Sequence, residues 1–368
     1  MAGKMRQPSD VLIVGAGFAG SLLALLMARR GHAVEVVDLH AAHPPEFRCE
    51  KLGLGQAQAL EDLGALEPIA ARAGLMDASP ASVAGVGLPY ADMVNALREA
   101  WPAAVGFHQG RVRAVETGED RQVVQLCSGE QLETRLLVLA TGRGERLRRE
   151  LGIHRRTLRE RHSLCIGFTL APAEGRPPLP SLAAHGRGGD GMGFVSLFPM
   201  GGTARANLFC YRDPGEAWAR GFRHDPLAAL IASFPHLEPQ LAGARPVGQT
   251  DFGVIDLYQC DGCVRPGVVL IGDAYASSCP ATAMGLTRVL TDVRQLALNH
   301  LPEWLSTPGM GADKIAAFYA DPVKRRTDEL SRRRAEFARF QATARGPAAG
   351  ALRMAKRLRG SLAARAAA

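Results

Sequence analysis

Three glycines near the start of the chain have the spacing of a nucleotide-binding turn. Gly15, Gly17 and Gly20 form the pattern GxGxxG, and Asp38 ends the next apolar run. In such a turn one glycine allows the tight bend, one lets the backbone approach a pyrophosphate, and one lets the helix pack closely on the strand. The free N–H groups of the helix then face the phosphates, and an acid at the position of Asp38 accepts hydrogen bonds from a ribose. The spacing predicts a dinucleotide site.

A second candidate site lies late in the chain, where residues 272–293 read GDAYASSCPATAMGLTRVLTDV. Asp273 follows the apolar run 268–271, so we expect it at the carboxyl end of a strand, where α/β proteins bind ligands. The fourteen residues after Asp273 carry no charge, and a helix is predicted from Gly285 onward. The backbone N–H groups of such a loop and helix start suit a flat, partly anionic heterocycle.

The elements that would position these residues alternate between strands and helices. Residues 11–38 predict strand, helix and strand, a βαβ unit with Gly31 closing the helix. After Gly152, glycine and proline become frequent, and short alternating segments predict an antiparallel sheet. The run 268–271 then returns to the pattern of a buried strand. The chain therefore leaves the nucleotide-binding domain and comes back to it.

This order predicts an α/β fold: a doubly wound, Rossmann-type domain interrupted by a mainly antiparallel β-sheet substrate domain, with a helical C-terminus. We expect the nucleotide-binding domain to comprise residues 9–75, 91–155 and 264–320. Residues 76–90 and 156–263 are assigned to the substrate domain. Residues 321–368 are expected to form a basic helical tail.

The basic residues of the chain are concentrated in this tail. The formal net charge is +8, yet the stretch from Lys324 to the end has thirteen Lys or Arg residues against three Asp or Glu, so the rest is slightly acidic. Two interpretations stay open: a solvated helix, or a docking surface for an acidic protein partner or an anionic surface. Nucleic acid is disfavoured because the tail has few aromatic residues and no recognition motif.

The cysteines and the apolar runs indicate the compartment. The seven cysteines are scattered and odd in number, which favours a reducing environment over a disulfide framework. No apolar run is long enough to span a bilayer, and the N-terminus lacks the regions of a signal peptide. We therefore expect a cytoplasmic protein without a transmembrane segment.

The second candidate site resembles the C-terminal flavin motif of the para-hydroxybenzoate hydroxylase family of FAD-dependent monooxygenases, which reads GDAAH, a proline, GxG or GxN, and a final Asp. The resemblance implies FAD as the cofactor. It implies that Asp273 binds the ribityl chain and that Pro280 borders the reaction side of the ring. The backbone amides of Leu286 and Thr287 would stabilise the charge of reduced flavin, and Gly285 would permit their close approach.

The same resemblance extends to the first turn and its surroundings. It implies that Arg48 lies near the pyrophosphate and the mobile flavin, that Tyr90 replaces a family Arg or Gln on FAD, and that the backbone of Val112 meets the adenine. With these three, the implied FAD contacts outside the second site are Gly15, Gly17, Phe18, Ala19, Gly20, Asp38, Thr141 and Gly142.

One departure from the family concerns the electron donor. The sequence Ala140-Thr141-Gly142 replaces the family's ADG, whose Asp contributes to NAD(P)H handling. Thr forms hydrogen bonds but supplies no charge, so either NAD(P)H or a partner flavin reductase is the expected donor. O₂ is the implied co-substrate.

The resemblance implies a hydroxylase that acts on an organic, aromatic or heteroaromatic substrate through a flavin C4a-hydroperoxide, without a metal. Lys51 and Pro280 are the candidate catalytic residues; Lys51 is singled out because lysine is rare in this arginine-rich chain. Cys279 and Tyr211 are interpreted first as packing residues. The alternatives are a halogenase or an alkene reductase of the same fold with a partner reductase, a carrier- or peptide-bound substrate, and a nucleotide-binding protein without turnover.

Overall fold

The computed structural model describes residues 8–346 and Gly350, and the chain divides into two compact units. Unit 1 comprises Met1–Arg159, Leu257–Ser278 and Ala283–Ser331, and unit 2 comprises Glu160–Asp256, Cys279–Thr282 and Arg332–Ala368.

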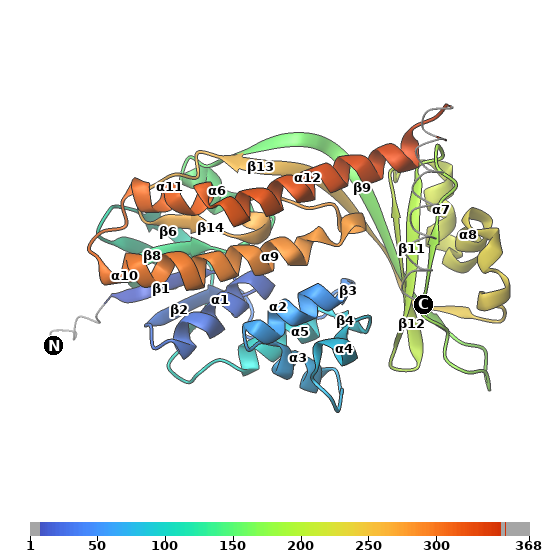
Figure 1. The fold of residues 1–368 in the computed structure, drawn as a ribbon, viewed down its shortest axis with the longest axis horizontal. Helices are drawn as coiled ribbons and strands as arrows, with labels where there is room; N and C mark the ends of the chain where they lie inside the picture. The colour runs from blue at the N-terminus through green and yellow to red at the C-terminus, as the bar shows by residue number, and fades with distance from the viewer. Residues whose placement is uncertain (1–7, 347–349, 351–368) are drawn as a thin grey trace. The chain divides into compact units, whose positions relative to one another are not determined.

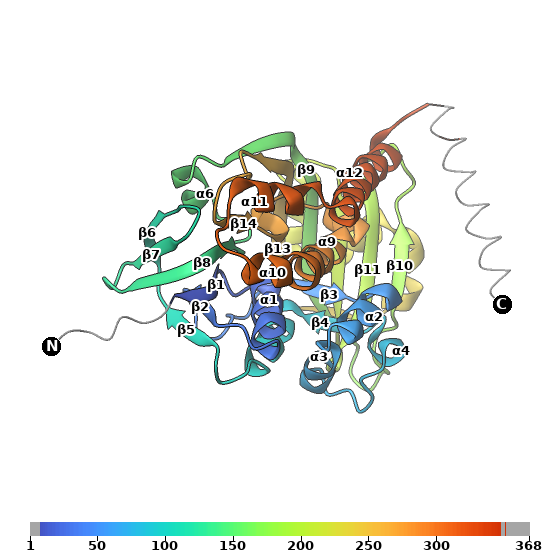
Figure 2. The ribbon, with the colours of Figure 1, turned by 60° about the vertical axis from the view of Figure 1, so that its left-hand side comes forward.

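Unit 1 contains a seven-stranded sheet in the order β5-β2-β1-β8-β7-β6, with β14 also paired to β8 (Figures 1 and 2). Its strands are β1 (Ser9–Val14), β2 (Val34–Asp38), β5 (Gly106–Gln109), β6 (Val112–Glu116), β7 (Gln122–Leu126), β8 (Gln131–Leu139) and β14 (Val268–Leu270). The pairs within β5, β2, β1, β8 and β14 are parallel, whereas β7 pairs antiparallel with β6 and β8.

The apolar run of β1 is continuous because the sheet is covered on both faces. Val11 and Ile13 belong to the core on one face, and Leu12 and Val14 belong to the core on the other. Such two-sided burial is typical of parallel sheets between helices.

In unit 1, α1 contacts α5 and α9. The helices of unit 1 are α1 (Phe18–Arg29), α2 (Leu54–Asp62), α3 (Leu66–Arg72), α4 (Pro80–Val83), α5 (Tyr90–Glu99), α6 (Arg146–Glu150), α9 (Met284–Arg294), the π-helix η5 (Gln295–His300), α10 (Leu301–Ser306) and α11 (Ala312–Ala320).

Unit 2 contains a five-stranded sheet in the order β10-β11-β12-β9-β13, in which the pairs from β10 to β9 are antiparallel. Its strands are β9 (His154–Ala171), β10 (Leu182–His185), β11 (Met192–Met200), β12 (Thr203–Cys210) and β13 (Arg245–Asp261). The helices α7 (Ala217–His224) and α8 (Pro226–Ser233) contribute Phe222 and Leu230 to its core. The predicted fold class, an α/β nucleotide-binding fold interrupted by an antiparallel sheet and followed by helices, is confirmed.

Residues 76–90 group with unit 1 and not with the sheet of unit 2, where the sequence had placed them. The reason is local pairing: β4 (Gly87–Pro89) pairs antiparallel with β3 (Cys49–Lys51), and α4 packs against α2. The short length of β4 gave no alternating pattern from which this pairing could be predicted.

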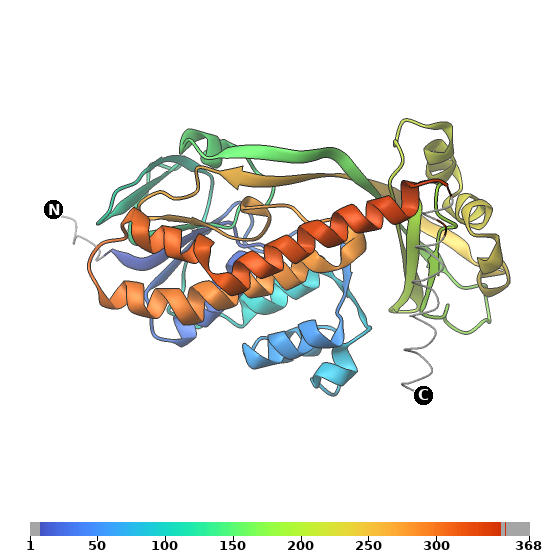
Figure 3. The ribbon, with the colours of Figure 1, turned by 45° about the horizontal axis from the view of Figure 1, so that its top comes forward.

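The segment that was expected to be a separate basic tail begins as an integral helix of unit 1. The helix α12 (Pro322–Thr343) runs beside α9 (Figure 3), and Lys324 and Ser331 on its inner side are buried. Within unit 1, the side chains of Lys324 and Asp328 contact α9 directly. Beyond residue 346, the predicted tail lies outside the described residues except for Gly350.

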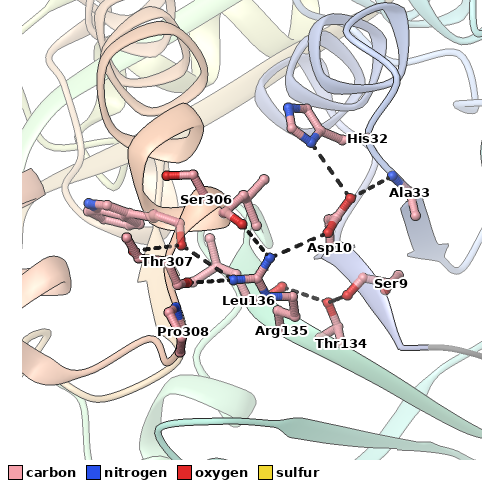
Figure 4. A network of polar contacts seen from close by, with 12 residues as sticks. Ser9, Asp10, His32, Ala33, Thr134, Arg135, Leu136, Ser306, Thr307 and Pro308 are labelled. Carbon is pink, nitrogen blue, oxygen red and sulfur yellow. Dashed lines mark hydrogen bonds and ion pairs between the residues drawn. The ribbon is translucent and has the colours of Figure 1, made fainter.

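The turn after α10 is held by two cations. The Arg135 guanidinium of β8 donates to the carbonyls of Leu305 and Thr307 at 2.7 and 2.8 Å and lies 3.8 Å from Asp10 (Figure 4). Lys314 of α11 donates to the carbonyls of Pro308 and Gly309, among others. These contacts fix the end of α10 to β8, an interior strand of the sheet. Among the described residues, every helix is too short or too polar to cross a bilayer.

Candidate active site

The glycine turn, Gly15–Gly20, joins β1 to α1 and has no space for side chains at its two ends. Gly15 has φ +100°, and a Cβ added there would lie 2.5 Å from the carbonyl oxygen of Ala140. A Cβ added at Gly20 would overlap the carbonyl oxygen of Gly15. The GxGxxG spacing therefore reflects both a left-handed turn and the close packing of helix on strand.

The N-terminus of α1 presents backbone donors that are held by two side chains. No side chain caps Gly17, the residue before the helix. The amide of Ala16 donates to Asp38 at 2.6 Å, and the amide of Phe18 donates to the Tyr90 hydroxyl at 3.1 Å. Asp38 and Tyr90 thus lie at the helix start that phosphates bind in dinucleotide folds.

Asp38 is fixed by further contacts that the sequence did not predict. Its Oδ1 accepts from the amide of His40 at 2.9 Å. The guanidinium of Arg98, in α5, lies 3.6 Å from its Oδ2. Arg98 is buried and also donates to the carbonyls of Ala16 and His40. Arg98 therefore stabilises the glycine turn through the carbonyl of Ala16 and the carboxylate of Asp38. The sequence around Arg98 has no motif that would predict this role.

Arg48 and Tyr90, predicted separately, form one assembly. The Arg48 guanidinium stacks over the Tyr90 ring at 3.8 Å from its centroid and forms a two-point contact with Glu46 at 2.6 and 2.8 Å. Burial raises the pKa of the Tyr90 hydroxyl, although the charge of Arg48 opposes this shift. Tyr90 therefore stays neutral while it accepts from the start of α1.

Asp273 is a half-buried carboxylate surrounded by guanidinium groups. Burial raises the pKa of Asp273, and the charges of nearby arginines oppose the shift. Burial likewise raises the pKa of Glu50, on which Asp273 acts as a like charge. The arginines that act on Asp273 are Arg288, Arg143, Arg48 and Arg148. Arg48 thus connects the first candidate site electrostatically with the second.

The hydroxyl of Thr141 tests whether the turn fits a ligand. It is buried and, among the described residues, has no hydrogen-bond partner. A buried unsatisfied hydroxyl is costly and calls for an explanation. Thr141 lies against Gly15, because a Cβ on Gly15 would be 3.1 Å from the Cα of Thr141. A phosphate or ribose oxygen at the glycine turn would satisfy this hydroxyl, so the residues present fit a dinucleotide.

The second segment, Gly272–Asp292, reaches the first within unit 1. Gly272 has φ +60°, and a Cβ added there would lie 3.6 Å from the Cβ of Ala19 in α1. Ala283 is left-handed with φ +52° and precedes α9 without a side-chain cap. Leu286 lies in the first turn of α9, where N–H groups have no acceptor within the helix. The hydroxyl of Thr287 accepts from Gln56 at 3.0 Å.

A buried charge pair supports this segment from α12. Asp292 accepts from the amide of Gly272 at 2.9 Å and from Lys324 at 2.7 Å. The side chains of Asp292 and Lys324 are both 1% exposed. Lys324 also lies 4.1 Å from the centroid of the Tyr275 ring. The rarity of lysine, which drew attention to Lys51, applied equally to Lys324, and this signal was missed.

Arg288 of α9 provides the second support. It donates to the carbonyl of Ala276 at 2.6 Å, to the Ser278 hydroxyl at 3.0 Å and to Asp328 of α12 at 2.8 Å. Its side chain is 2% exposed. The guanidinium of Arg288 therefore stabilises the loop after Asp273. The family motif does not predict an arginine at this position.

The remaining predicted residues lie in different environments. Lys51 is exposed at the end of β3, and Gly142 has φ +57° in the turn after β8. Val112 is buried, and its carbonyl accepts from Arg146. Pro280 begins a 3-10 turn, η4 (Pro280–Thr282), that belongs to unit 2. Its neighbour Cys279 is buried in unit 2 beside Tyr211 and Ser163, each 3.7 Å from its sulfur.

Known proteins resemble the chain over the same regions. Residues 8–79 match a family described as an FAD binding domain. The chain is 26% identical over 372 residues to the ubiquinone hydroxylase UbiL of Rhodospirillum rubrum, covering 90% of this chain and 80% of that protein. It is 25% identical over 337 residues to the 3-demethoxyubiquinol 3-hydroxylase of Escherichia coli, covering 82% and 83%. The crystal structure of the flavin-dependent halogenase CmlS shares the fold, with a TM-score of 0.71 at 18% identity over 96% of this chain and 71% of that chain.

The matched FAD binding domain and the two similar hydroxylases indicate an FAD-dependent oxidoreductase. Within that class, the chain is similar to the group A FAD-dependent monooxygenases, the family of para-hydroxybenzoate hydroxylase, and this similarity supports an FAD-dependent hydroxylase.

Proposed function

We propose that this enzyme hydroxylates a phenolic or quinol-like aromatic ring with O₂ as co-substrate. The two similar proteins named above are, by their names, hydroxylases of ubiquinone and of 3-demethoxyubiquinol, which supports a substrate of that chemical class. The observation that carries the proposal is the meeting of the two segments in unit 1, where Gly272 lies against Ala19 and the charge of Arg48 acts on Asp273.

The residues that would hold FAD are those of the glycine turn and the second segment. The helix start at Phe18, the Thr141 hydroxyl and Arg48 would bind the diphosphate, and Asp38 would bind the adenosine ribose. Asp273 would accept hydrogen bonds from the ribityl hydroxyls, and the N–H groups near Leu286 would face the ring. Bound FAD would supply the activation of O₂ for ring hydroxylation.

The catalytic assignments stay predictions. Pro280 would border the substrate side of the ring, and Lys51 would act as a proton-carrying or orienting group. Cys279 and Tyr211 are buried in contact with each other in unit 2, and burial raises the pKa of the Cys279 thiol and of the Tyr211 hydroxyl. Neither group would ionise near neutral pH, so both would orient a substrate and not act as bases.

The electron donor is NAD(P)H or a partner flavin reductase. Thr141 occupies the position of the family's acid and supplies no charge for a nicotinamide cofactor.

The seven cysteines are all free thiols, which supports the expected cytoplasmic location.

The test is a two-part assay of the purified holoenzyme. Anaerobic flavin reduction by NADH and by NADPH, with and without a flavin reductase, identifies the donor. Turnover of a short-chain demethoxyubiquinol analogue under isotopically labelled O₂ should then give a hydroxylated product that carries the label. A product without the label would refute the monooxygenase reaction on this ring.

The halogenase alternative has support from the fold alone, because the similarity to CmlS is only 18% identity. The same assay with added chloride and bromide distinguishes it. A halogenated product in place of the hydroxylated one would replace the proposed function.

A further inference from the structure

The helix α12 has a buried face and an exposed face of opposite character. Its buried face carries Lys324, Ser331, Ala335 and Ala342, at the spacing of one side of a helix. Its acidic residues, Asp328, Glu329 and Glu336, are all at least partly buried. The acidic residues of α12 are therefore less exposed than most of its basic and aromatic residues, although Glu329 lies four residues before Arg333 on the same helix side.

The second half of α12, within unit 2, exposes only basic and apolar large side chains. Arg332, Arg333 and Arg334 are exposed, and Phe337 and Phe340 are 43% and 46% exposed. We call these five residues the Arg-Phe face. Arg333, Phe337 and Phe340 follow the i, i+4, i+7 spacing of one helix side.

The two phenylalanines are unusual on this chain. The sequence has thirteen phenylalanines, and among the described residues only these two are exposed. Four of the ten exposed large hydrophobic residues lie on α12, since Val323 and Leu330 join them. Exposed apolar residues that gather on one element mark an interaction surface, whereas scattered ones do not.

We propose that the Arg-Phe face docks on an anionic phospholipid surface. A helix with arginines beside aromatic residues lies in the bilayer interface, with its apolar side chains among the acyl chains and its cations at the lipid phosphates. The charge is complementary, and the chain after Arg345 adds five Lys or Arg residues and no Asp or Glu. An acidic protein is the competing occupant, because protein interfaces are also enriched in arginine and aromatic residues, and the test below includes it as an outcome. This proposal is independent of the substrate class.

The test is co-sedimentation of the full-length holoenzyme with vesicles of phosphatidylglycerol and phosphatidylcholine in equal parts, and with vesicles of phosphatidylcholine alone. The protein should bind the anionic vesicles, lose binding at high salt, and ignore the neutral ones. The triple variant R332Q/R333Q/R334Q should weaken binding by roughly tenfold or more. The double variant Phe337→Ser with Phe340→Ser should weaken it to a similar degree, at unchanged flavin content.

Two control variants keep the result interpretable. The triple variant R332K/R333K/R334K keeps the charge and should bind like the wild type, which separates lipid attraction from guanidinium contacts inside the protein. The triple variant R187Q/R220Q/R245Q removes three other exposed arginines of unit 2 and should bind like the wild type. Equal binding by all variants, or binding of an acidic carrier protein but of no vesicle, would overturn the proposal.

Discussion

The glycine turn and the second segment meet in unit 1, yet they are stabilised in opposite ways. The glycine turn is held by backbone amides that donate to Asp38 and Tyr90, with one guanidinium, Arg98, behind them. The second segment is held by buried charges, Lys324 with Asp292 and Arg288 with Asp328, that come from α12. Both supports come from distant parts of the sequence: Tyr90 is 72 residues after Phe18, Arg98 is 82 residues after Ala16, and Lys324 is 32 residues after Asp292.

Because the two segments are stabilised differently, the affinity for FAD and the stability of the apoprotein are expected to depend on the same acid in the glycine turn but on different acids in the second segment. In the glycine turn the acid that would bind the cofactor is also an internal hydrogen-bond acceptor, so it stabilises the protein without the ligand. In the second segment the acid proposed to bind the ribityl chain, Asp273, carries a burial cost, and the stabilising acid is Asp292. The two carboxylates after the two strands should therefore respond to mutation in opposite directions.

The largest expected effect is on the buried pair. Lys324→Met leaves Asp292 charged and buried, and breaking such a pair typically costs about 3–5 kcal/mol of unfolding free energy. Urea unfolding of the apoprotein measures it. The double variant Lys324→Met with Asp292→Asn should recover much of the loss, and Arg325→Met, an exposed neighbour, should stay within about 0.5 kcal/mol of the wild type. A Lys324→Met protein as stable as the wild type would contradict the supporting role of α12.

The next effect is on flavin retention. Asp273→Ala removes a charged acceptor for the ribityl chain, so FAD should bind about tenfold to a hundredfold more weakly, as expected for a lost hydrogen bond to a charged group. Titration of the apoprotein with FAD measures this. Unchanged flavin content would refute the ribityl role of Asp273.

Asp273→Asn tests the same residue through pH. Burial raises the pKa of Asp273 in the folded state, so this carboxyl group binds a proton more readily in the folded protein than in the unfolded chain. Its contribution to the stability of the apoprotein therefore falls as the pH rises above about 4. The neutral amide has no such cost. The stability of Asp273→Asn relative to the wild type should therefore increase from acidic to neutral pH in urea unfolding. A pH-independent difference would show that the carboxyl group is not desolvated.

The sequence predicted the parts of the candidate site that have short residue patterns, and it did not predict the contacts between distant side chains. The glycine turn, Asp38 and the strand before Asp273 were predictable because their signals are short patterns of residue type. Arg48 and Tyr90 were predicted singly from the family, but their stacking was not. Arg98, Arg288 and the Lys324–Asp292 pair were missed because their partners lie far away in sequence. An ion pair leaves no periodic pattern, and in an arginine-rich chain a single arginine carries little information.

Asp38→Ala should lower the stability of the apoprotein, in contrast to Asp273→Asn. It removes the acceptor of the Ala16 and His40 amides and leaves Arg98 without its carboxylate, so a loss of about 1–2 kcal/mol is expected. Thermal unfolding without FAD measures it, and Glu116→Ala, which removes an exposed acid at the end of β6, provides a comparison. A stabilised Asp38→Ala apoprotein would remove the distinction between the two segments.

The smallest effect concerns Thr141, whose hydroxyl has no partner among the described residues. Thr141→Val keeps the shape and removes a buried unsatisfied group, so the apoprotein should be as stable as the wild type or more stable by up to about 1 kcal/mol. If FAD satisfies this hydroxyl, its affinity should fall by about 0.5–1.5 kcal/mol at the same time. Thr141→Ser, which keeps the hydroxyl, should retain the affinity. Calorimetric titration of both variants with FAD measures whether the Thr141 hydroxyl contacts the cofactor. Equal affinity of Thr141→Val and the wild type would mean that this hydroxyl faces no ligand. The glycine turn would then bind FAD through its backbone and Asp38 alone.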